Sequence, residues 1–482
     1  MNIFNKNPNL IWLTGVLIVS ALGYGMSAHA QNKKWTLKEC INEALEKNIT
    51  LNQNELNDEI NKINYNQSKA NLYPNLNFND GHALYFGHSI NPSNNQYAKQ
   101  NYSENTPALS SSVTLFNGSR NFNLIEENKL IYQAGNLDIE KMKNDLTLNV
   151  IAAYLQVLYE YEAVNIIQYQ ENATSEQVTY TQKYVAVGNK PQSSLFQIQA
   201  QLAANKAAKV NADNQLQLAK VVLMQIMQMP LTNDFEVELP DSSSIIPVPV
   251  LASSIDIYNT AASVLPNVKS AKVKTDAAIA ALKVTKAELI PKLTLSGGLY
   301  TYYSSLSSTL HTTEQIQTIG YLKDNPSEQV VGPVGVTNTS GYPLFNQFKD
   351  NFGQSIALNL SIPIFNNLQF KSDIKKAHLA IKNAQLNESL AGNMLRQAIE
   401  QAYTDQLGAS KTYMATKEQM QYEEKYYNDL QKQLKQGMAT MTDYLVAQNN
   451  YYGAVVSNVQ AKYQYMFKSK VLAFYTGELI IK

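Results

Sequence analysis

The chain contains two copies of one pattern, and the spacing between the copies constrains its fold more than any other feature. Residues 69–76 (KANLYPNL) recur at 286–293 (KAELIPKL), 217 positions later (291 − 74), and in both copies a helical pattern stops at a proline. Residues 115–199 recur 249 positions later (364 − 115) without insertion or deletion. Loops tolerate insertions and deletions, so a constant offset over this distance indicates two rigid rods of equal length. The alternative is a chance match of low-complexity helical sequence.

The two offsets differ by 32 positions (249 − 217), and this extra chain must lie between the two strands of the second copy. We therefore expect a duplicated helix-strand-strand-helix-helix unit, with a first repeat at 31–250 and a second at 251–482.

Long amphipathic helices account for most of each repeat. One helix is expected from Ser119 to Tyr184, which at 1.5 Å per residue would reach roughly 100 Å. Two apolar stripes run along it, which predicts neighbours on two sides of this helix, and a second-repeat helix carries a similar stripe. The stripes are Leu146, Val150, Ala153, Val157, Tyr161 and Val164; Leu148, Ile151, Leu155 and Leu158; and, interrupted by Glu388, Ile374, Ala377, Ile381, Ala384, Ala391, Leu395, Ala398 and Ala402. A ring of helices fits this pattern, and a large soluble helical bundle is the alternative.

Four segments alternate with the period of a strand: 76–85, 109–115, 293–303 and 356–364. Most are about ten residues long, the length with which a tilted strand crosses a bilayer core. Four strands cannot close a membrane barrel, so several chains must contribute. An ordinary soluble sandwich is the alternative. The connections at about 86–108 and 304–352 are expected to be long polar loops.

Residues 1–30 have the pattern of a secretory signal peptide. Lys6 precedes an apolar run from Leu10 to Leu22, and Ala28-His29-Ala30 fits a cleavage site. A membrane anchor is the alternative, but the run is shorter than the roughly 18 to 20 apolar residues that span a bilayer. We therefore expect an exported protein.

Composition and motifs argue against several other classes of function. The 39 basic and 39 acidic residues balance, which argues against a nucleic-acid partner. The single cysteine, Cys40, can form no disulfide within the chain and is not the first residue of a lipoprotein. No phosphate-binding loop, CxxC pair or HExxH pattern occurs, and the histidines are widely spaced. We expect no enzyme activity, no cofactor and no metal site.

Taken together, the organisation and the motifs resemble the TolC family of outer-membrane efflux proteins. The resemblance covers essentially the whole mature chain and rests on short motifs that are duplicated and in the same order. They are Trp35-Thr36-Leu37 with Ile41 and Ala44-Leu45, Tyr73-Pro74 and Ile290-Pro291, Leu115-Phe116-Asn117-Gly118 and Pro363-Ile364-Phe365-Asn366, and glycine turns at Gly188 and Gly437.

This resemblance implies a mainly α protein with transmembrane β-strands. Three chains would supply a 12-stranded outer-membrane β-barrel, continuous with a long periplasmic α-helical barrel. The partners implied are two further copies of the chain, a periplasmic adaptor protein, an inner-membrane pump and outer-membrane lipid. Adaptor docking would involve the two helix turns at the periplasmic tip. The residues concerned are Gly188, Asn189, Leu195, Gly437, Met438 and Leu445. For the glycines, a plain helix cap is the alternative.

The resemblance also implies a gate, at which this sequence partly departs from the family. Asp443 falls on the first acidic position, Val446 where a second aspartate would be, and Ala439 where an arginine would be. The first-repeat counterpart of Asp443 is Ser194. Three copies of Asp443 around an axis would attract cations, which makes it a candidate pore constriction. The alternative is a solvated acid near a helix start after Thr440.

We therefore expect the passive exit duct of a tripartite efflux system for small molecules. The outlet of a type I protein secretion system is the nearest alternative. A secreted helical scaffold or adhesin is the rival from another class.

Overall fold

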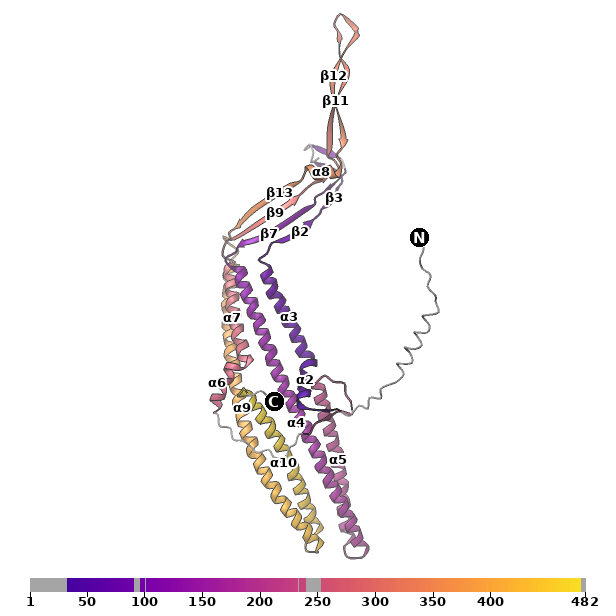
Figure 1. Ribbon diagram of the computed structural model, residues 1–482, viewed down its shortest axis with the longest axis vertical. Coiled ribbons are helices and arrows are strands. Elements are labelled where there is room, and N and C mark those ends of the chain that lie inside the picture. Colours follow the sequence, from indigo (N-terminus) through magenta and orange to yellow (C-terminus); the bar gives the residue numbers. More distant parts are fainter. Residues whose placement is uncertain (1–32, 91–95, 100, 233, 240–252, 478–482) are drawn as a thin grey trace, which may run out of the picture. The chain divides into compact units, whose positions relative to one another are not determined.

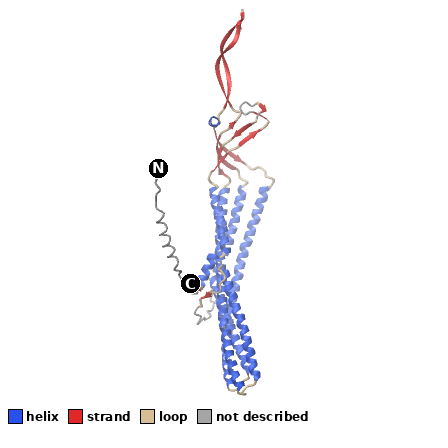
Figure 2. Ribbon diagram, turned by 90° about the vertical axis from the view of Figure 1, so that its right-hand side faces the viewer, coloured by secondary structure: helices blue, strands red, loops and turns tan. Residues whose placement is uncertain are grey.

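A computed structural model describes residues 33–90, 96–99, 101–232, 234–239 and 253–477 (Figures 1 and 2). The expected signal peptide and the expected repeat boundary lie outside these residues. The described chain forms two compact units. Unit 1 takes the described parts of residues 1–52, 142–261 and 396–482, and unit 2 takes those of 53–141 and 262–395.

Each of the four major helices of the first repeat has a partner of equal length in the second. The lengths are 11, 22, 67 and 35 residues in both repeats. The first set is α2 (Leu37–Lys47), α3 (Ile49–Ala70), α4 (Arg120–Ala186) and α5 (Gln192–Ile226). The second set is α6 (Ser254–Val264), α7 (Pro266–Ala287), α9 (Gln369–Lys435) and α10 (Met441–Tyr475). The long helix expected at Ser119–Tyr184 is confirmed as α4. None of the helices in the described residues is both long and apolar enough to span a membrane.

A hydrophobic core holds unit 1 together. Helices α2, α4, α5 and α10 contribute to it. Most of each expected stripe of α4 is buried there, with Val150, Val157, Ile151 and Leu158 fully enclosed, whereas Tyr161 is exposed. Two short strands, β1 (Lys34–Trp35) and β8 (Glu236–Val237), pair in parallel. The two stripes on α4 therefore do have neighbours on two sides.

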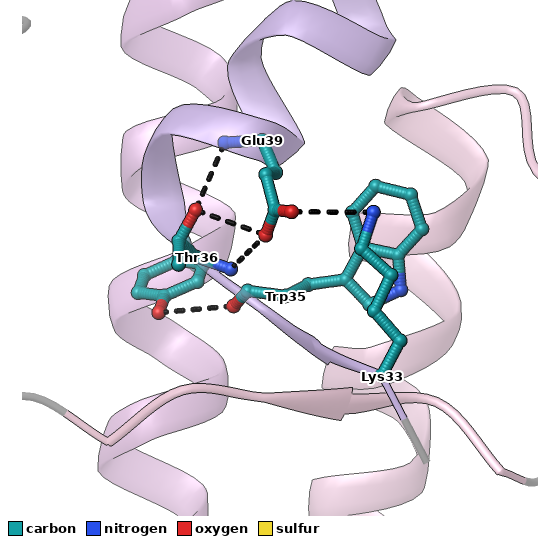
Figure 3. A network of polar contacts seen from close by, with 5 residues as sticks. Lys33, Trp35, Thr36 and Glu39 are labelled. Carbon is teal, nitrogen blue, oxygen red and sulfur yellow. Dashed lines mark hydrogen bonds and ion pairs between the residues drawn. The ribbon is translucent and has the colours of Figure 1, made fainter. Parts of the chain in front are cut away.

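The start of α2 explains the motif that opens the mature chain. Thr36 Oγ1 accepts a hydrogen bond from the Glu39 amide at 3.1 Å, and the Glu39 carboxylate accepts one from the Thr36 amide at 2.9 Å (Figure 3). Lys33 Nζ lies 3.2 Å from that carboxylate and 4.0 Å from the centre of the Trp35 ring. The Tyr154 hydroxyl on α4 donates to the Trp35 carbonyl at 3.3 Å. The motif thus caps α2 and fixes it to α4.

In unit 2, polar contacts link four helices in the order α3-α4-α7-α9. The carboxylate of Asp58 on α3 lies against Gly135 of α4, where an added Cβ would meet it at 2.0 Å. Asp138 of α4 accepts hydrogen bonds from Ser270 and Lys274 of α7, each at 2.6 Å. The Thr275 hydroxyl of α7 donates to Glu388 of α9 at 2.8 Å, so the residue that interrupts the apolar stripe of α9 has a polar partner.

The main sheet of unit 2 continues this helix layer. Its four antiparallel strands have the order β13-β9-β7-β2 and belong to helices α9, α7, α4 and α3 respectively (Figure 1). Their bounds are β2 (Asn75–Asn79), β7 (Ala108–Phe116), β9 (Lys292–Tyr300) and β13 (Gly353–Ser361). Each strand therefore connects directly to a helix that occupies the same position in the helix order.

Two parts of unit 2 differ from the sequence-based expectation. The first expected strand, 76–85, breaks at Asp80-Gly81, and its second part, β3 (His82–Tyr85), pairs with β6 (Tyr102–Asn105) instead of β7. The two expected polar loops contain further structure. These elements are β4 (His88–Ile90), β5 (Tyr97–Lys99), β6, β10 (Tyr303–Ser304), β11 (Ser308–Leu322), β12 (Asn325–Gly341) and α8 (Leu344–Asp350). β11 and β12 contain many Thr, Ile and Val residues, which favour extended backbone.

Candidate channel wall and helix turns

The sheet of unit 2 has one apolar face that is open to the surroundings. The strand register places side chains of all four strands on this face, and Ile356 is 86% exposed. Its large apolar members are Leu76, Phe78, Leu109, Val113, Leu293, Leu295, Leu299, Ile356, Leu358 and Leu360. Exposing such a continuous apolar surface is unfavourable in water but favourable in contact with lipid.

The opposite face of the same sheet is polar. Asn359 Nδ2 donates to Ser296 Oγ at 3.1 Å, and Asn75 Oδ1 accepts from the Ser112 amide at 2.7 Å. Register-matched neighbours on this face include Asn77, Ser110, Thr114, Thr294, Gly298 and Ser355. A sheet that is apolar on one side and lined with small polar groups on the other suits the wall of an aqueous pore.

Both outer strands of the sheet have an open edge. In the described residues, β2 pairs only with β7 and β13 pairs only with β9. β2 leads away from α3 and β13 leads towards α9, so the two edge strands run in opposite directions. The free edge of β13 can therefore accept the β2 edge of another copy as an antiparallel neighbour.

The two outer helices of the same layer carry open apolar stripes. Leu56, Ile60 and Ile63 lie exposed on α3, on the side opposite to the buried residues Asp58 and Ser68. On α9 a second exposed stripe runs at helical spacing through Leu379, Leu386, Leu390 and Met394. These stripes were not predicted from the sequence, although their spacing is visible there, because a stripe covered by a neighbouring helix has the same spacing as one left open.

The two helix turns of unit 1 have the same backbone. Gly188 and Gly437 have φ values of +76° and +77°. In the first turn the Asn189 amide donates to the Tyr184 carbonyl at 2.8 Å and the Gly188 amide to Val185 at 3.0 Å. The second turn repeats both bonds, since Met438 donates to Gln433 at 2.8 Å and Gly437 to Leu434 at 3.3 Å. This glycine-dependent helix ending satisfies carbonyls that would otherwise lack partners.

The other predicted tip residues separate into exposed and buried groups. Asn189 and Met438 are exposed beside the glycines. Leu195 is buried, and Leu445 packs half-buried against the same core, which joins α5, α9 and α10. Two exposed apolar side chains that the sequence analysis did not single out, Val187 and Phe196, lie close to the first turn in sequence.

Asp443 lies at the start of α10 as a helix cap. Its carboxylate accepts hydrogen bonds from the Thr440 hydroxyl at 2.6 Å and the Thr440 amide at 3.1 Å, and Thr440 Oγ1 accepts from the Asp443 amide at 3.1 Å. These bonds hold the pKa of the Asp443 carboxyl below its ordinary value. Val446 is exposed and Ala439 is half-buried. The helix cap expected as the alternative role of Asp443 is therefore present. The second carboxylate oxygen takes no part in these hydrogen bonds.

Within the described part of the chain, no group of three or more His, Cys, Asp or Glu side chains is placed to hold a metal ion. The cysteine, Cys40, is buried in the core of unit 1, and burial raises its pKa to about 12.

Comparison with known proteins identifies the family. A sequence model of the outer membrane efflux protein family matches residues 40–227 and 257–478, most of the chain. The chain belongs to the outer membrane efflux protein family. The two matched segments agree with the internal duplication. This efflux protein is 20% identical to an uncharacterized protein of Haemophilus influenzae over 367 residues, which cover 74% of this chain and 69% of the relative.

Solved structures share the fold of this efflux protein. The outer membrane protein VceC of Vibrio cholerae superposes with a TM-score of 0.71 at 15% identity, covering 92% of this chain and 96% of VceC. The CmeC outer membrane channel of Campylobacter jejuni gives 0.71 at 18% identity, covering 93% and 86%. The chain is therefore an outer-membrane efflux protein with the fold of outer-membrane channels. The family is one of channels and not of enzymes.

Proposed function

We propose that three copies of this chain close into one passive exit duct, which a periplasmic adaptor protein connects to an inner-membrane pump. The main support for the proposal is found in unit 2. Its layer of four helices and four strands ends on each side in an open strand edge and an exposed apolar helix stripe. Small molecules would pass along the polar face of the sheet, and the apolar face would contact outer-membrane lipid.

The sheet closes if the β2 edge of each copy pairs with the β13 edge of the next. This contact joins two different surfaces of the chain, so it forms a ring when the rotation between copies closes. With three copies the ring contains twelve antiparallel strands and has no remaining edge, as lipid-exposed sheets require.

The helices close in the same way if the α3 stripe packs on the α9 stripe of the next copy. Leu56 precedes the last position of α3, Ala70, by 14 (70 − 56), and Leu386 follows the first position of α9, Gln369, by 17 (386 − 369). The difference of three positions is about 4.5 Å along a helix axis, so the two leucines lie at nearly the same level. Burial of both stripes supports a continuous helical wall below the barrel.

A disulfide experiment tests this ring. The double variant Leu56→Cys with Leu386→Cys should form covalent trimers on mild oxidation of outer membranes, because each copy then joins the next. Each single variant should not. The matched control is Asn54→Cys with Leu386→Cys, since Asn54 lies at a similar level of α3 but is turned towards the partly buried side. Monomeric protein in mild detergent would overturn the proposal, and so would equal cross-linking in the control.

Adaptor docking at the two helix turns is the second part of the proposal. The exposed backbone at Gly188, Asn189, Gly437 and Met438 and the apolar side chain of Phe196 support it. Replacing Phe196 by Glu should impair efflux in cells while trimers stay intact in detergent. Normal efflux with that variant would contradict docking at this surface. Leu195 and Leu445 would act indirectly, by holding the turns in position from the core.

A further inference from the structure

Two helices of the second repeat each carry a stripe of exposed lysines. The members of each stripe recur every three or four positions, as residues on one side of a helix do. The stripe on α7 contains Lys269, Lys272, Asp276, Ile279, Lys283 and Lys286, and the stripe on α9 contains Lys371, Lys375, His378 and Lys382. Within the described residues, none of these seven lysines forms a salt bridge. The two stripes together are called the lysine face below.

Both stripes lie on the same side of the helix layer. A groove of about 420 Å³ between α7 and α9 marks the opposite side, and its lining includes Ser270 of α7 and Ala384 of α9. Lys272 follows Ser270 by two positions, which is about 200° around the helix. Lys382 precedes Ala384 by two positions and is turned away by the same angle. The lysine face therefore points away from the groove on both helices.

In the proposed duct the lysine face lies on the outside. Each helix in a closed ring of twelve turns by about 30° (360°/12), so its two neighbours are about 150° apart on the inner side and about 210° apart on the outer side. On α9 the stripe that faces α7, which includes Ala384 and Glu388, can be compared with the open stripe through Leu386 and Leu390. At 100° per residue these stripes are roughly 140–160° apart on the groove side and roughly 200–220° apart on the lysine side. The groove therefore faces the pore, and the lysines point outwards.

The first repeat provides an internal control for this face. Its equivalent positions lie 217 residues earlier on α3 and 249 residues earlier on α4. Three cations and three anions occupy them, whereas the lysine face has seven lysines and one aspartate. The equivalent residues are Asn52, Glu55, Glu59, Lys62, Asn66, Lys69, Phe122, Glu126, Lys129 and Gln133. Hydration of an outer helix surface does not require such a one-sided charge, so the excess indicates an anionic partner.

Four of the lysines lie close to the strands. They are at most six positions (375 − 369) from the strand-side ends of α7 and α9, or about 9 Å along the helix axis. These strand-side lysines are Lys283, Lys286, Lys371 and Lys375. Large exposed apolar side chains lie beside them in the chain, between the helices and strands β9 and β13; they are Leu289, Ile290, Ile364, Phe365 and Leu368. Cations next to exposed apolar groups are typical of a surface that meets a membrane interface.

Stability of the helices alone does not account for these lysines. Lys286 lies in the last turn of α7, where the helix dipole favours a cation. Lys371, however, lies in the first turn of α9, which contains no acidic residue and where the dipole disfavours a cation. A negative charge outside the chain would remove this unfavourable interaction.

We propose that the strand-side lysines bind the anionic headgroups of phospholipids in the membrane leaflet that faces the helices. The inference rests on the duct proposed above, because closure of the ring places the lysine face outside and the apolar sheet face in lipid. Attraction to a charged membrane surface falls off within a Debye length of about 8–10 Å. The strand-side lysines lie within that distance of the strands, whereas Lys269 and Lys272 lie 15 to 18 positions (287 − 272, 287 − 269), or about 22–27 Å, from the end of α7.

The lipid selectivity of intact trimers tests the inference. Electron paramagnetic resonance of chain-labelled phosphatidylglycerol and phosphatidylcholine, each added to trimers in phosphatidylcholine bilayers, measures the preference for the anionic headgroup. The preference should be about fivefold, the effect of one Lys near an anionic surface, and should fall in about 0.5 M salt. Lys283→Gln with Lys286→Gln should reduce it at least about twofold. The matched control, Lys269→Gln with Lys272→Gln, removes the same charge from the same side of α7 and should leave the preference nearly unchanged.

The outcomes separate headgroup binding from the duct. Trimers without a preference for phosphatidylglycerol would overturn headgroup binding and leave the duct intact, and so would an unchanged preference in the Lys283 and Lys286 variant. An equal loss in the control would overturn binding at the strand-side level, because it would show that the attraction depends only on total charge. Monomeric protein that the Leu56 and Leu386 cysteines do not link would overturn the duct itself.

Discussion

The turn between α4 and α5 and the turn between α9 and α10 share a backbone but start the following helix differently. Each ends the long helix at a glycine with positive φ and the same two amide bonds. The second turn continues into a capping box made by Thr440 and Asp443. The first continues from Pro191, whose side chain offers no cap hydrogen bond to α5.

This difference separates the features that both repeats retain from those that have diverged. Helix length and the glycine are retained in both copies, because a change in either would move one turn away from the level of the other. The residues around the turn have diverged. Tyr444 occupies the core position where the first repeat has Leu195, and Asp443 occupies the position of Ser194. The first repeat therefore serves as an internal control for the chemistry of the second.

The largest expected effect comes from the core below the turns. Tyr444 is 1% exposed and its hydroxyl lies 3.2 Å from that of Tyr427, while Leu195 is 7% exposed. Tyr444→Ala should lower the free energy of unfolding by about 3 to 5 kcal/mol and Leu195→Ala by about 2 to 5 kcal/mol, because both leave cavities. Thermal loss of helical circular dichroism in detergent measures this. Tyr444→Phe keeps the volume and should cost about 1 kcal/mol; a larger loss would mean that the hydroxyl dominates.

The next largest effect on stability is expected at the two turn glycines, Gly188 and Gly437. A β-branched residue at φ near +76° is strained although no atom lies within 4 Å of an added Cβ, so Gly188→Val and Gly437→Val should each cost about 1 to 2 kcal/mol or more. Asn tolerates this backbone, so Gly188→Asn and Gly437→Asn are matched controls with smaller losses. Hydrogen exchange of the Asn189 and Met438 amides reports the two turns separately. Unequal losses would contradict the equivalence of the turns.

The difference in helix capping between the two turns should have a smaller effect on stability. Thr440→Ala removes an N-cap side chain and should cost roughly 1 kcal/mol, seen as faster exchange of the Asp443 amide. Pro191→Ala in the first repeat removes no cap hydrogen bond and should leave exchange at the start of α5 nearly unchanged. A similar change in both helices would show that the capping box contributes little.

The pH dependence of the cap should be the smallest effect on stability. The folded-state pKa of Asp443 is lowered, so its contribution is present above the unfolded-state value of about 3.9 and is lost as the pH falls through the folded-state pKa. Exchange protection of the first turn of α10 should fall in that acidic range. Asp443→Asn should abolish this step, and its persistence would assign it to another carboxylate.

The same variants separate the cap from a pore constriction. If three copies of Asp443 line the narrowest part of the duct, Asp443→Ala should reduce cation preference in planar bilayers, whereas Thr440→Ala should not, because it keeps the carboxylate. An equal change in both variants would mean that the cap, and not the charge, controls the current.

Much of the fold was predictable from local patterns. The constant offset between the two copies predicted equal helices, and α4 and α9 are both 67 residues long. Period-two alternation predicted the two faces of the sheet. The hairpin at 308–341 was expected to be part of a polar loop because residues 304–352 are rich in Asn, Ser, Gly and Pro. Its strand pairing depends on contacts across the turn.

The candidate site was predictable only in part. Gly188 and Gly437 were identified because a positive φ selects a residue type that is visible in the sequence. Leu195 is buried and Leu445 is half-buried, which the sequence did not predict, since burial depends on which helices surround a side chain. Likewise, the stripes on α3 and α9 look like core stripes in the sequence. Only the folded structure shows that their side chains are exposed.

By itself, the sequence determined periodicity, element length and the residues at sharp turns, because these properties act between neighbours along the chain. Only the tertiary structure decided the order of the four strands and which edges and stripes remain open. Those features depend on contacts between segments far apart in sequence, whose free energy is gained only after the chain has folded.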